Sequence, residues 1–220
     1  MKQNDKELFL LKEKLSTMWQ KVISQVERSK LALFNGDTCI AEELLYIEKE
    51  VNSIELSIDK NCENYIALFH PVAIDLRLVL SVMRISLHLE RVADYVAGIA
   101  YFVKDEDCDS FFKKWKEELG LEEVYTTILN MLTTTWLAFQ SEFIDNAKSI
   151  LQKDIIINVL QDKAFSTLST NLHNFDNYEI KCAMKTLLLF QKLERTGDHC
   201  KNIVEELVFY IDAKSLKHKI

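Results

Sequence analysis

The segment from residue 78 to residue 103 carries the clearest hydrophobic pattern in the chain. Its apolar residues recur at alternating intervals of four and three positions: Leu78, Val82, Ile85, Leu89, Val92, Val96, Ile99 and Val103. This spacing places them along one side of an α-helix, in a stripe that becomes buried when helices pack together. We therefore predict a long amphipathic helix whose apolar stripe forms part of a bundle core.

Turn and helix-breaking residues divide the whole chain into six long helical segments. The first ends at Asn35-Gly36, and the second ends at His70-Pro71, because the residue before proline is disfavoured in a helix. The third reaches about residue 104. The remaining helices are predicted near residues 111–142, 144–172 and 177–212.

This organisation predicts an all-α protein made of two tandem three-helix bundles. Only four glycines and one proline occur in 220 residues, which is too few for the turns of a β-rich fold. The acidic segment at residues 105–110 is the expected hinge. We therefore place the first repeat at residues 1–106 and the second at residues 107–220.

A short charged motif occurs once in each predicted repeat. Leu89-Glu90-Arg91-Val92-Ala93-Asp94 is matched by Leu193-Glu194-Arg195-Thr196-Gly197-Asp198, and residues 89–99 share five of eleven identities with residues 193–203. In each copy a glutamate and an aspartate stand four positions apart on one helix face. Like charges at this spacing repel unless a cation lies between them. The motif therefore favours a metal site.

The second helix of each repeat offers a further acid and amide at the same spacing: Glu48 with Asn52, and Asp154 with Asn158. All are hard oxygen ligands that suit Mg²⁺, Mn²⁺, Ca²⁺ or iron, with Zn²⁺ kept among the candidates because the pattern does not identify the metal. The predicted metal ligands are Glu48, Glu90, Asp94, Asp154, Glu194 and Asp198, with Asn52, Asn158 and His199 as additional candidates. No Glu-x-x-His pair supports a ferritin-like di-iron centre.

Composition narrows the classes of function. The formal charge of −7 and the lack of a dense basic block argue against nucleic-acid binding, and no apolar run is long enough to insert into a membrane. The chain lacks a glycine-rich phosphate loop and an evident nucleophile–base pair, so we expect no catalytic residue and no enzyme. Five scattered cysteines predict reduced thiols in a cytoplasmic protein.

The repeated motif resembles the twin Leu-Glu-Arg-Ile-Gly-Asp signatures of the PhoU family of phosphate-uptake regulators. The segment His70-Pro71-Val72-Ala73-Ile74-Asp75-Leu76-Arg77 is similar to that family's Gln-Pro-x-Ala-x-Asp-Leu-Arg segment. The chain departs from the family pattern at Ala93, which replaces a glycine. It departs again at Asn52 and Asn158, where the family often has an acid.

The resemblance implies pseudo-twofold symmetry between the repeats and surface metal clusters at the two motifs. It also implies a non-enzymatic adaptor that restrains phosphate uptake and phosphate-starvation signalling by contacting a phosphate ABC transporter ATPase and a sensor histidine kinase. Arg91 and Arg195 are expected to pair with neighbouring acids or to hold an anion beside a metal. Candidate partner or homodimer surfaces comprise Asp75, Arg77, Arg91 and Arg195, and the outer stripe Leu76, Leu80, Met83 and Leu87.

Two other classes of function remain open at the level of sequence. One is a carboxylate-bridged metal-binding helical protein with a redox or storage role. The other is a structural helical scaffold whose acids are solvated or paired with arginine. Stoichiometric metal and turnover would favour the first, whereas complete pairing of the acids without metal would favour the second.

Overall fold

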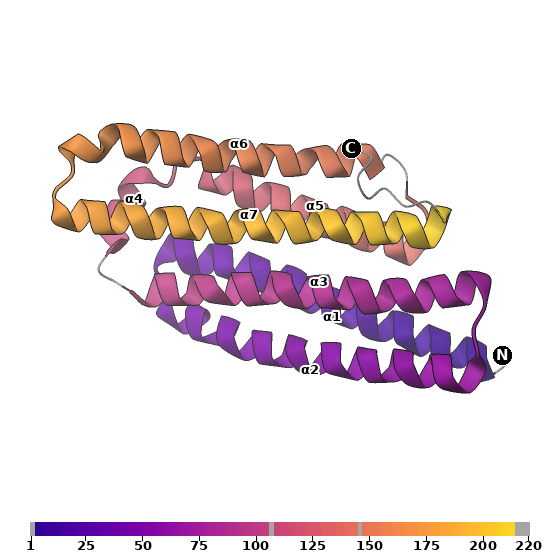
Figure 1. The fold of residues 1–220 in the computed structure, drawn as a ribbon. Coiled ribbons are helices and arrows are strands. Elements are labelled where there is room, and N and C mark those ends of the chain that lie inside the picture. The colour runs from indigo at the N-terminus through magenta and orange to yellow at the C-terminus, as the bar shows by residue number, and fades with distance from the viewer. Residues whose placement is uncertain (1–2, 106–107, 145–146, 214–220) are drawn as a thin grey trace.

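The computed structural model describes residues 3–105, 108–144 and 147–213, and the regular structure within these ranges is entirely helical (Figure 1). Two bundles of long helices lie side by side in an elongated molecule. The predicted all-α class and the pair of bundles are confirmed. The helices are α1 Gln3–Asn35, α2 Thr38–Phe69, α3 Ala73–Lys104, α4 Asp109–Trp115, α5 Leu121–Ser141, α6 Ala147–Asn171, the short 3₁₀ turn η2 Leu172–Asn174, and α7 Asn177–Asp212.

Helices α1, α2 and α3 form the first bundle around the predicted apolar stripe. Every residue of that stripe is buried, from Leu78 to Val103. Asp37 caps the start of α2 by accepting a hydrogen bond from the Ile40 amide. Gly36 precedes it with a φ of 68°, a left-handed conformation that ends α1 where the sequence predicts.

The second bundle contains the main departure from the predicted helices. The single helix expected over residues 111–142 is wrong, because it is broken into α4 and α5. Gly120 has a φ of 74°, which a helix cannot continue through. The short α4 stays packed because Phe111, Phe112 and Trp115 are buried.

The two bundles meet chiefly along α3 and α7, which are equivalent helices of the two repeats. They lie side by side and run in opposite directions (Figure 1), which fits a twofold axis perpendicular to the two helices. Arg84 on α3 forms an ion pair with Glu206 on α7 at 3.1 Å. From α1, the Trp19 indole donates to the Leu132 carbonyl of α5 at 3.2 Å, so the bundles also share buried contacts.

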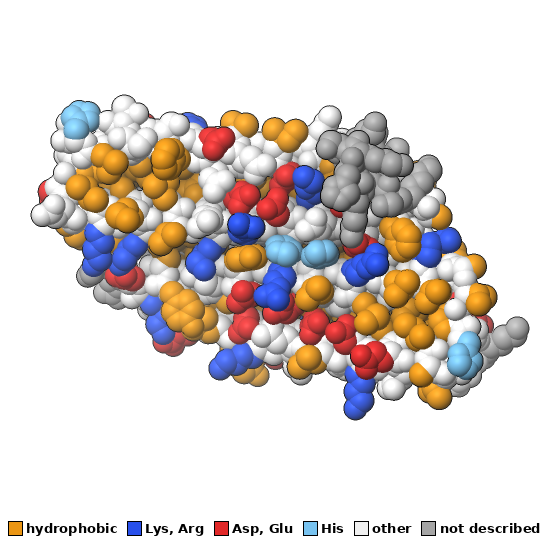
Figure 2. Space-filling view, in the orientation of Figure 1, with side chains coloured by type: hydrophobic (Ala, Val, Ile, Leu, Met, Phe, Trp, Pro, Cys, Tyr) orange, Lys and Arg blue, Asp and Glu red, His pale blue; other side chains and the backbone are white. Residues whose placement is uncertain are grey.

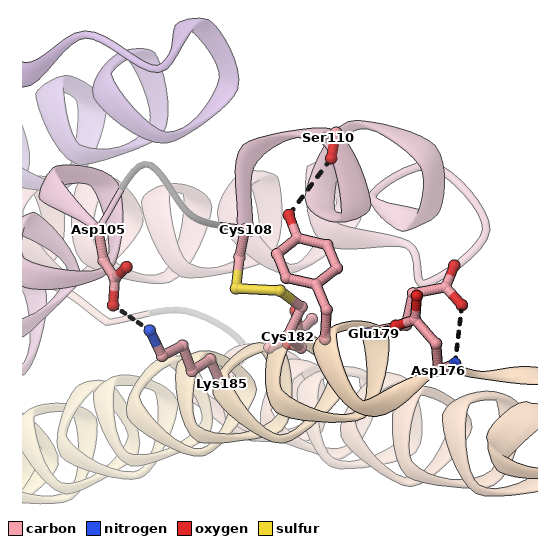
Figure 3. The surroundings of a disulfide bond; sticks show 9 residues. Asp105, Cys108, Ser110, Asp176, Glu179, Cys182 and Lys185 are labelled. Atoms are coloured by element: carbon pink, nitrogen blue, oxygen red, sulfur yellow. Dashed lines mark hydrogen bonds and ion pairs between the residues drawn. A yellow bond between two sulfur atoms is a disulfide. The ribbon is translucent and has the colours of Figure 1, made fainter.

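Cys108 and Cys182 form a disulfide bond, which corrects the expectation that the thiols are reduced. Their Cα atoms are 5.3 Å apart although 74 positions separate them in sequence. Figure 3 shows the bond joining the start of α4 to α7, near the ion pair between Asp105 and Lys185. It therefore fastens the beginning of the second repeat to its last helix.

The other three cysteines have free thiols. Cys39 is exposed, whereas Cys62 and Cys200 are buried. Burial raises the pKa of Cys62 to about 12, so this thiol stays protonated at neutral pH.

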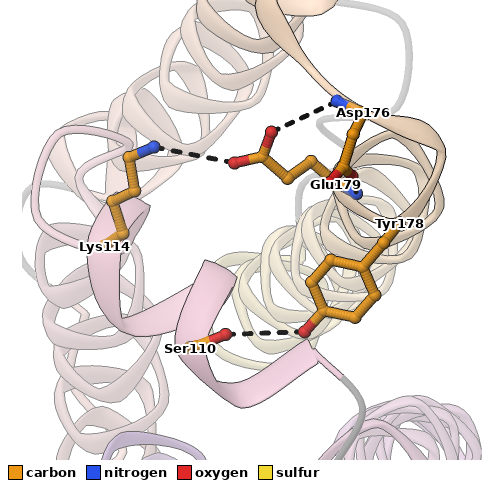
Figure 4. Close-up of polar contacts among 5 residues, drawn as sticks. All are labelled: Ser110, Lys114, Asp176, Tyr178 and Glu179. Atoms are coloured by element: carbon orange, nitrogen blue, oxygen red, sulfur yellow. Dashed lines mark hydrogen bonds and ion pairs between the residues drawn. The ribbon is translucent and has the colours of Figure 1, made fainter.

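Polar contacts close the same end of the second bundle (Figure 4). Asp176 caps α7 in a capping box in which the Glu179 amide donates to the Asp176 carboxylate at 2.8 Å. Glu179 also lies 3.7 Å from the Lys114 ammonium of α4. The predicted boundary between residues 106 and 107 lies outside the described residues.

Candidate functional site

The first carboxylate site lies on α2 and α3 and comprises Glu48, Asn52, Glu90 and Asp94. The Asn52 amide donates a hydrogen bond to Glu48. Burial raises the pKa of Glu90; Arg91 opposes this rise, and the charges of Asp94 and Glu48 add to it. The structure therefore brings the four predicted residues of this repeat together.

Glu55 is an acid of this site that the sequence analysis missed. It follows Glu48 by seven positions on α2, which returns it to the same helix face. Burial raises the pKa of Glu55, and the charges of Asp59 and Glu90 raise it further. The spacing of residues 48, 52 and 55 carries the signal, since all three positions share one face of α2.

The second carboxylate site lies on α6 and α7 and comprises Asp154, Asn158, Glu194 and Asp198. Asp154 is only 4% exposed, and its Oδ2 atom lies 3.6 Å from the Lys201 ammonium. Burial raises the pKa of Asp154, Lys201 opposes this rise, and the charge of Asp198 adds to it. This repeat also assembles its predicted residues.

Gly197 explains why α6 approaches α7 so closely at the second site. A Cβ atom at this position would lie 2.7 Å from Ile157 Cδ1 and 3.4 Å from Asp154 Oδ1. The missing side chain therefore leaves space for Asp154 beside α7.

The protein's own cations leave much of the negative charge at both sites uncompensated. Arg91 Nε lies 3.5 Å from Glu90, and Arg195 Nε lies 3.9 Å from Glu194, and both guanidinium groups are half exposed. Within the described ranges, Asp94 and Asp198 form no ion pair. Burial raises the pKa of Glu194, and the charge of Asp198 raises it further.

Three buried oxygen atoms bear on whether the side chains of the two sites are suited to binding a metal ion. Among the described residues, Asn52 Oδ1 in the first site, and Asp154 Oδ1 and Asn158 Oδ1 in the second, have no hydrogen-bond partner. Buried oxygens without partners are unfavourable, and a bound hard cation would satisfy them. As the side chains stand, no three His, Cys, Asp or Glu residues in the described chain converge into a ready-made cage. Cation binding therefore requires the flexible glutamates to turn inward.

The two sites stay apart on the surface. Figure 2 shows two groups of acidic side chains separated by histidine and basic side chains. His199, predicted as an additional ligand, has its Nδ1 atom 3.0 Å from Nδ1 of His88 on α3. The structure thus places His199 between α3 and α7 as well as beside Asp198.

The predicted partner surfaces are only partly accessible. Arg77 Nε is buried without a hydrogen-bond partner, and Asp75 lines a cleft of about 390 Å³ together with Lys12, Glu142 and Tyr210. Leu87 is exposed on the outer stripe, whereas Leu76, Leu80 and Met83 are half-buried. Docking at these surfaces stays a prediction. Within the described residues, no helix is both long and apolar enough to span a membrane.

Fold and site together define a class of two-repeat helical proteins with one carboxylate site on neighbouring helices of each repeat. Residues 15–103 and 121–207 each match the PhoU domain. The chain belongs to the PhoU family.

Similar proteins include the phosphate-specific transport system accessory protein PhoU of Escherichia coli (strain K12), at 28% identity over 96% of this chain and 86% of that protein. PhoU homolog 1 of Thermotoga maritima is 24% identical over 97% of this chain and 90% of its own length. The crystal structure of PhoU from Pseudomonas aeruginosa superposes with a TM-score of 0.85 at 25% identity, covering 96% of this chain and all of that one. The phosphate transport system regulatory protein PhoU from Streptococcus pneumoniae gives 0.83 at 26% identity, over 97% and 99% of the two chains.

Proposed function

We propose that this chain is a cytoplasmic accessory protein that restrains a phosphate transport system and its starvation signalling. It acts by protein contact with the transporter ATPase and a sensor histidine kinase, and it performs no catalysis. The observation that carries this proposal is the match of both repeats to the PhoU domain, together with relatives that are named as accessory proteins of phosphate-specific transport.

The two carboxylate sites supply the chemistry of this proposed role. They bind a hard divalent or trivalent metal ion such as Mg²⁺, Mn²⁺, iron or Zn²⁺ through Glu48, Glu90 and Asp94 in one repeat and Asp154, Glu194 and Asp198 in the other. The support for this is the set of buried oxygens without partners beside incompletely paired carboxylates. A bound metal supplies positive charge, which makes an acidic face compatible with docking a partner.

The first experiment measures bound metal by mass spectrometry in untagged protein and in the variant Glu90→Ala, Asp94→Ala, Glu194→Ala, Asp198→Ala. We expect stoichiometric metal in the unaltered chain and none in the variant. The matched control removes four exposed acids outside the sites: Glu13→Ala, Glu27→Ala, Glu117→Ala and Glu118→Ala. Metal retained by the folded site variant, or lost equally in the control, would contradict the assignment.

The same three proteins then test the docking role. The affinity of each for the purified transporter ATPase is measured with and without metal. We expect the site variant alone to lose the effect of metal on this affinity. Unchanged partner affinity in a folded, metal-free site variant would count against a role for metal in docking.

A further inference from the structure

A row of nitrogen-bearing side chains separates the two carboxylate sites along the α3–α7 contact. On α3 they recur three positions apart, and on α7 three and four positions apart, so each set follows one helix face. We call this set the axial band: His88, Arg91, Lys192, Arg195 and His199. The two faces touch where the Nδ1 atoms of His88 and His199 lie 3.0 Å apart.

Arg91 and Arg195 are equivalent residues of the two repeats, 104 positions apart. Because α3 and α7 run in opposite directions, both arginines lie near the middle of their contact. Arg91 follows His88 by three positions and Arg195 precedes His199 by four, so each lies about one helical turn from the contact between the two imidazoles. The two guanidinium groups therefore lie near the same histidine contact, one from each repeat.

Lys192 adds a third cation from α7. A Cβ atom at Gly98 would lie 2.5 Å from the Lys192 Nζ atom, so the flexible lysine side chain rests beside the α3 backbone at this glycine. Within the described part of the chain, Lys192 forms no ion pair with an acid. This ammonium thus bridges the two repeats without a carboxylate partner.

The arginines keep donors available for a ligand. Their approaches to Glu90 and Glu194, at 3.5 and 3.9 Å, are too long for good hydrogen bonds. Neither guanidinium donates a hydrogen bond elsewhere in the described residues. A planar guanidinium presents paired donors that match two oxygens of a phosphate group.

The surrounding acids oppose an anion while they remain charged. The axial band and Lys201 supply four full positive charges, whereas the neighbouring acids number seven: Glu48, Glu55, Glu90, Asp94, Asp154, Glu194 and Asp198. Metal ions at the carboxylate sites would reverse this balance, because a bound cation is the largest local charge in such a site. Anion binding at the band is therefore linked to metal binding beside it.

We propose that the axial band binds a tetrahedral oxyanion, inorganic phosphate, between Arg91 and Arg195 when the carboxylate sites hold metal. Lys192 contributes a further charge, and the ligand contacts both repeats at once. This inference rests on the metal sites of the proposed function. It makes the α3–α7 contact the place where phosphate would act on the arrangement of the two bundles.

The test is calorimetric titration of inorganic phosphate into the full chain, with and without Mn²⁺, and with sulfate for comparison. The variant Arg91→Gln, Arg195→Gln removes both guanidinium groups. The control Lys60→Gln, Lys163→Gln makes the same change in charge at exposed positions outside the axial band. We expect binding only with Mn²⁺, weakened roughly tenfold or more by the arginine variant and unchanged by the control. Arg91→Lys, Arg195→Lys keeps both charges and should recover only part of the affinity.

The outcomes separate this inference from the proposed function. Mn²⁺ uptake without phosphate binding overturns the axial site and leaves the metal sites standing. Phosphate binding that survives in the arginine variant places the anion on the metal instead, and equal affinity with and without Mn²⁺ overturns the linkage. A chain that takes up no metal and binds no phosphate contradicts both proposals.

Discussion

The two carboxylate sites share one motif but differ in how the chain compensates their charge. In the second site, Lys201 lies 3.6 Å from the buried Asp154. The equivalent position in the first repeat, 104 residues earlier, is the buried Ala97, so no lysine enters that site. Glu48 instead accepts a hydrogen bond from Asn52 and stays partly exposed. The repeats therefore offer one closed, partly neutralised site and one open site that depends more on a bound cation.

The disulfide is present in the second repeat and not in the described part of the first, and its removal should have the largest effect on stability. A cross-link that closes a loop of 74 residues stabilises a protein by about 4 kcal/mol in the chain-entropy estimate. We therefore expect Cys108→Ser, Cys182→Ser to lower the free energy of unfolding by about that amount, measured by urea denaturation under non-reducing conditions.

The exposed Cys39 provides the control for this prediction. Cys39→Ser should leave the urea midpoint unchanged, because that thiol is not bonded. Equal stability of the double-serine variant and the unaltered oxidised chain would show that the cross-link contributes nothing.

Removing the Lys201 ammonium group should make the second carboxylate site resemble the first, which has no lysine among its described residues. Lys201→Met keeps much of the apolar stem but removes the charge beside Asp154, so a divalent metal would face less repulsion. We expect Mn²⁺ to bind the second site about tenfold more tightly, since screening reduces a pair of charges at this distance to roughly 1–2 kcal/mol.

Calorimetry in the background Glu90→Ala, Asp94→Ala isolates the second site for this measurement. Lys163→Met, on the same bundle but outside the site, is the matched control. Weaker Mn²⁺ binding in the Lys201 variant would mean that the lysine holds Asp154 in position and does not compete with the metal.

The raised carboxyl pKa values predict that the stability of the fold changes with pH, in one direction without bound metal and in the other direction with it. Burial raises the pKa of both Glu90 and Glu194 above the ordinary 4.5, so the folded state binds these protons more tightly than the unfolded state. The two ionised glutamates destabilise the folded state at pH values above their raised pKa values. This destabilisation is relieved as the pH falls toward 4.5. The metal-free chain should thus gain stability over this window, seen as a rise in Tm as the pH is lowered.

Metal should reverse this trend, because protons compete with the cation for the same oxygens. Glu142 acts in the opposite direction, since its hydrogen bond with Lys12 lowers the pKa of this carboxyl. The comparison with Glu90→Gln, Glu194→Gln isolates the sites, and this variant should show a smaller gain. An identical pH dependence in both metal-free proteins would exclude these glutamates as its source.

The sequence predicts features that repeat locally and misses those that depend on packing. The stripe on α3 and the end of α1 at Gly36 follow from signals within one segment, and both are found. The break before α5 rests on Gly120 alone, amid residues that favour a helix. The contact between Lys201 and Asp154 has no sequence signal, because it requires the approach of α6 to α7.

The disulfide is another feature that depends on packing and could not be predicted from the sequence. Cys108 and Cys182 lie on different helices, and an odd number of scattered cysteines does not specify a pairing. The acids of each repeat lie near one another for the opposite reason, since each pair recurs at a fixed helical spacing, and their role as metal ligands stays a prediction. Glu55 extends that spacing by one turn, beyond the two-residue motif that repeats in the two halves.

Gly197→Ala, which gives the second repeat the residue that the first has at Ala93, should have the smallest effect. The added methyl group would contact the end of the buried Ile157 side chain at 2.7 Å, an overpacking that costs about 1–3 kcal/mol. Alanine offsets about 1 kcal/mol of this cost through its higher helix propensity. We expect a net loss of about 1 kcal/mol in urea denaturation and a small weakening of Mn²⁺ binding at the second site, because Asp154 lies against the same space. A loss of several kcal/mol would instead show that Gly197 sets the spacing of α6 and α7 and, with it, the burial that distinguishes the two sites.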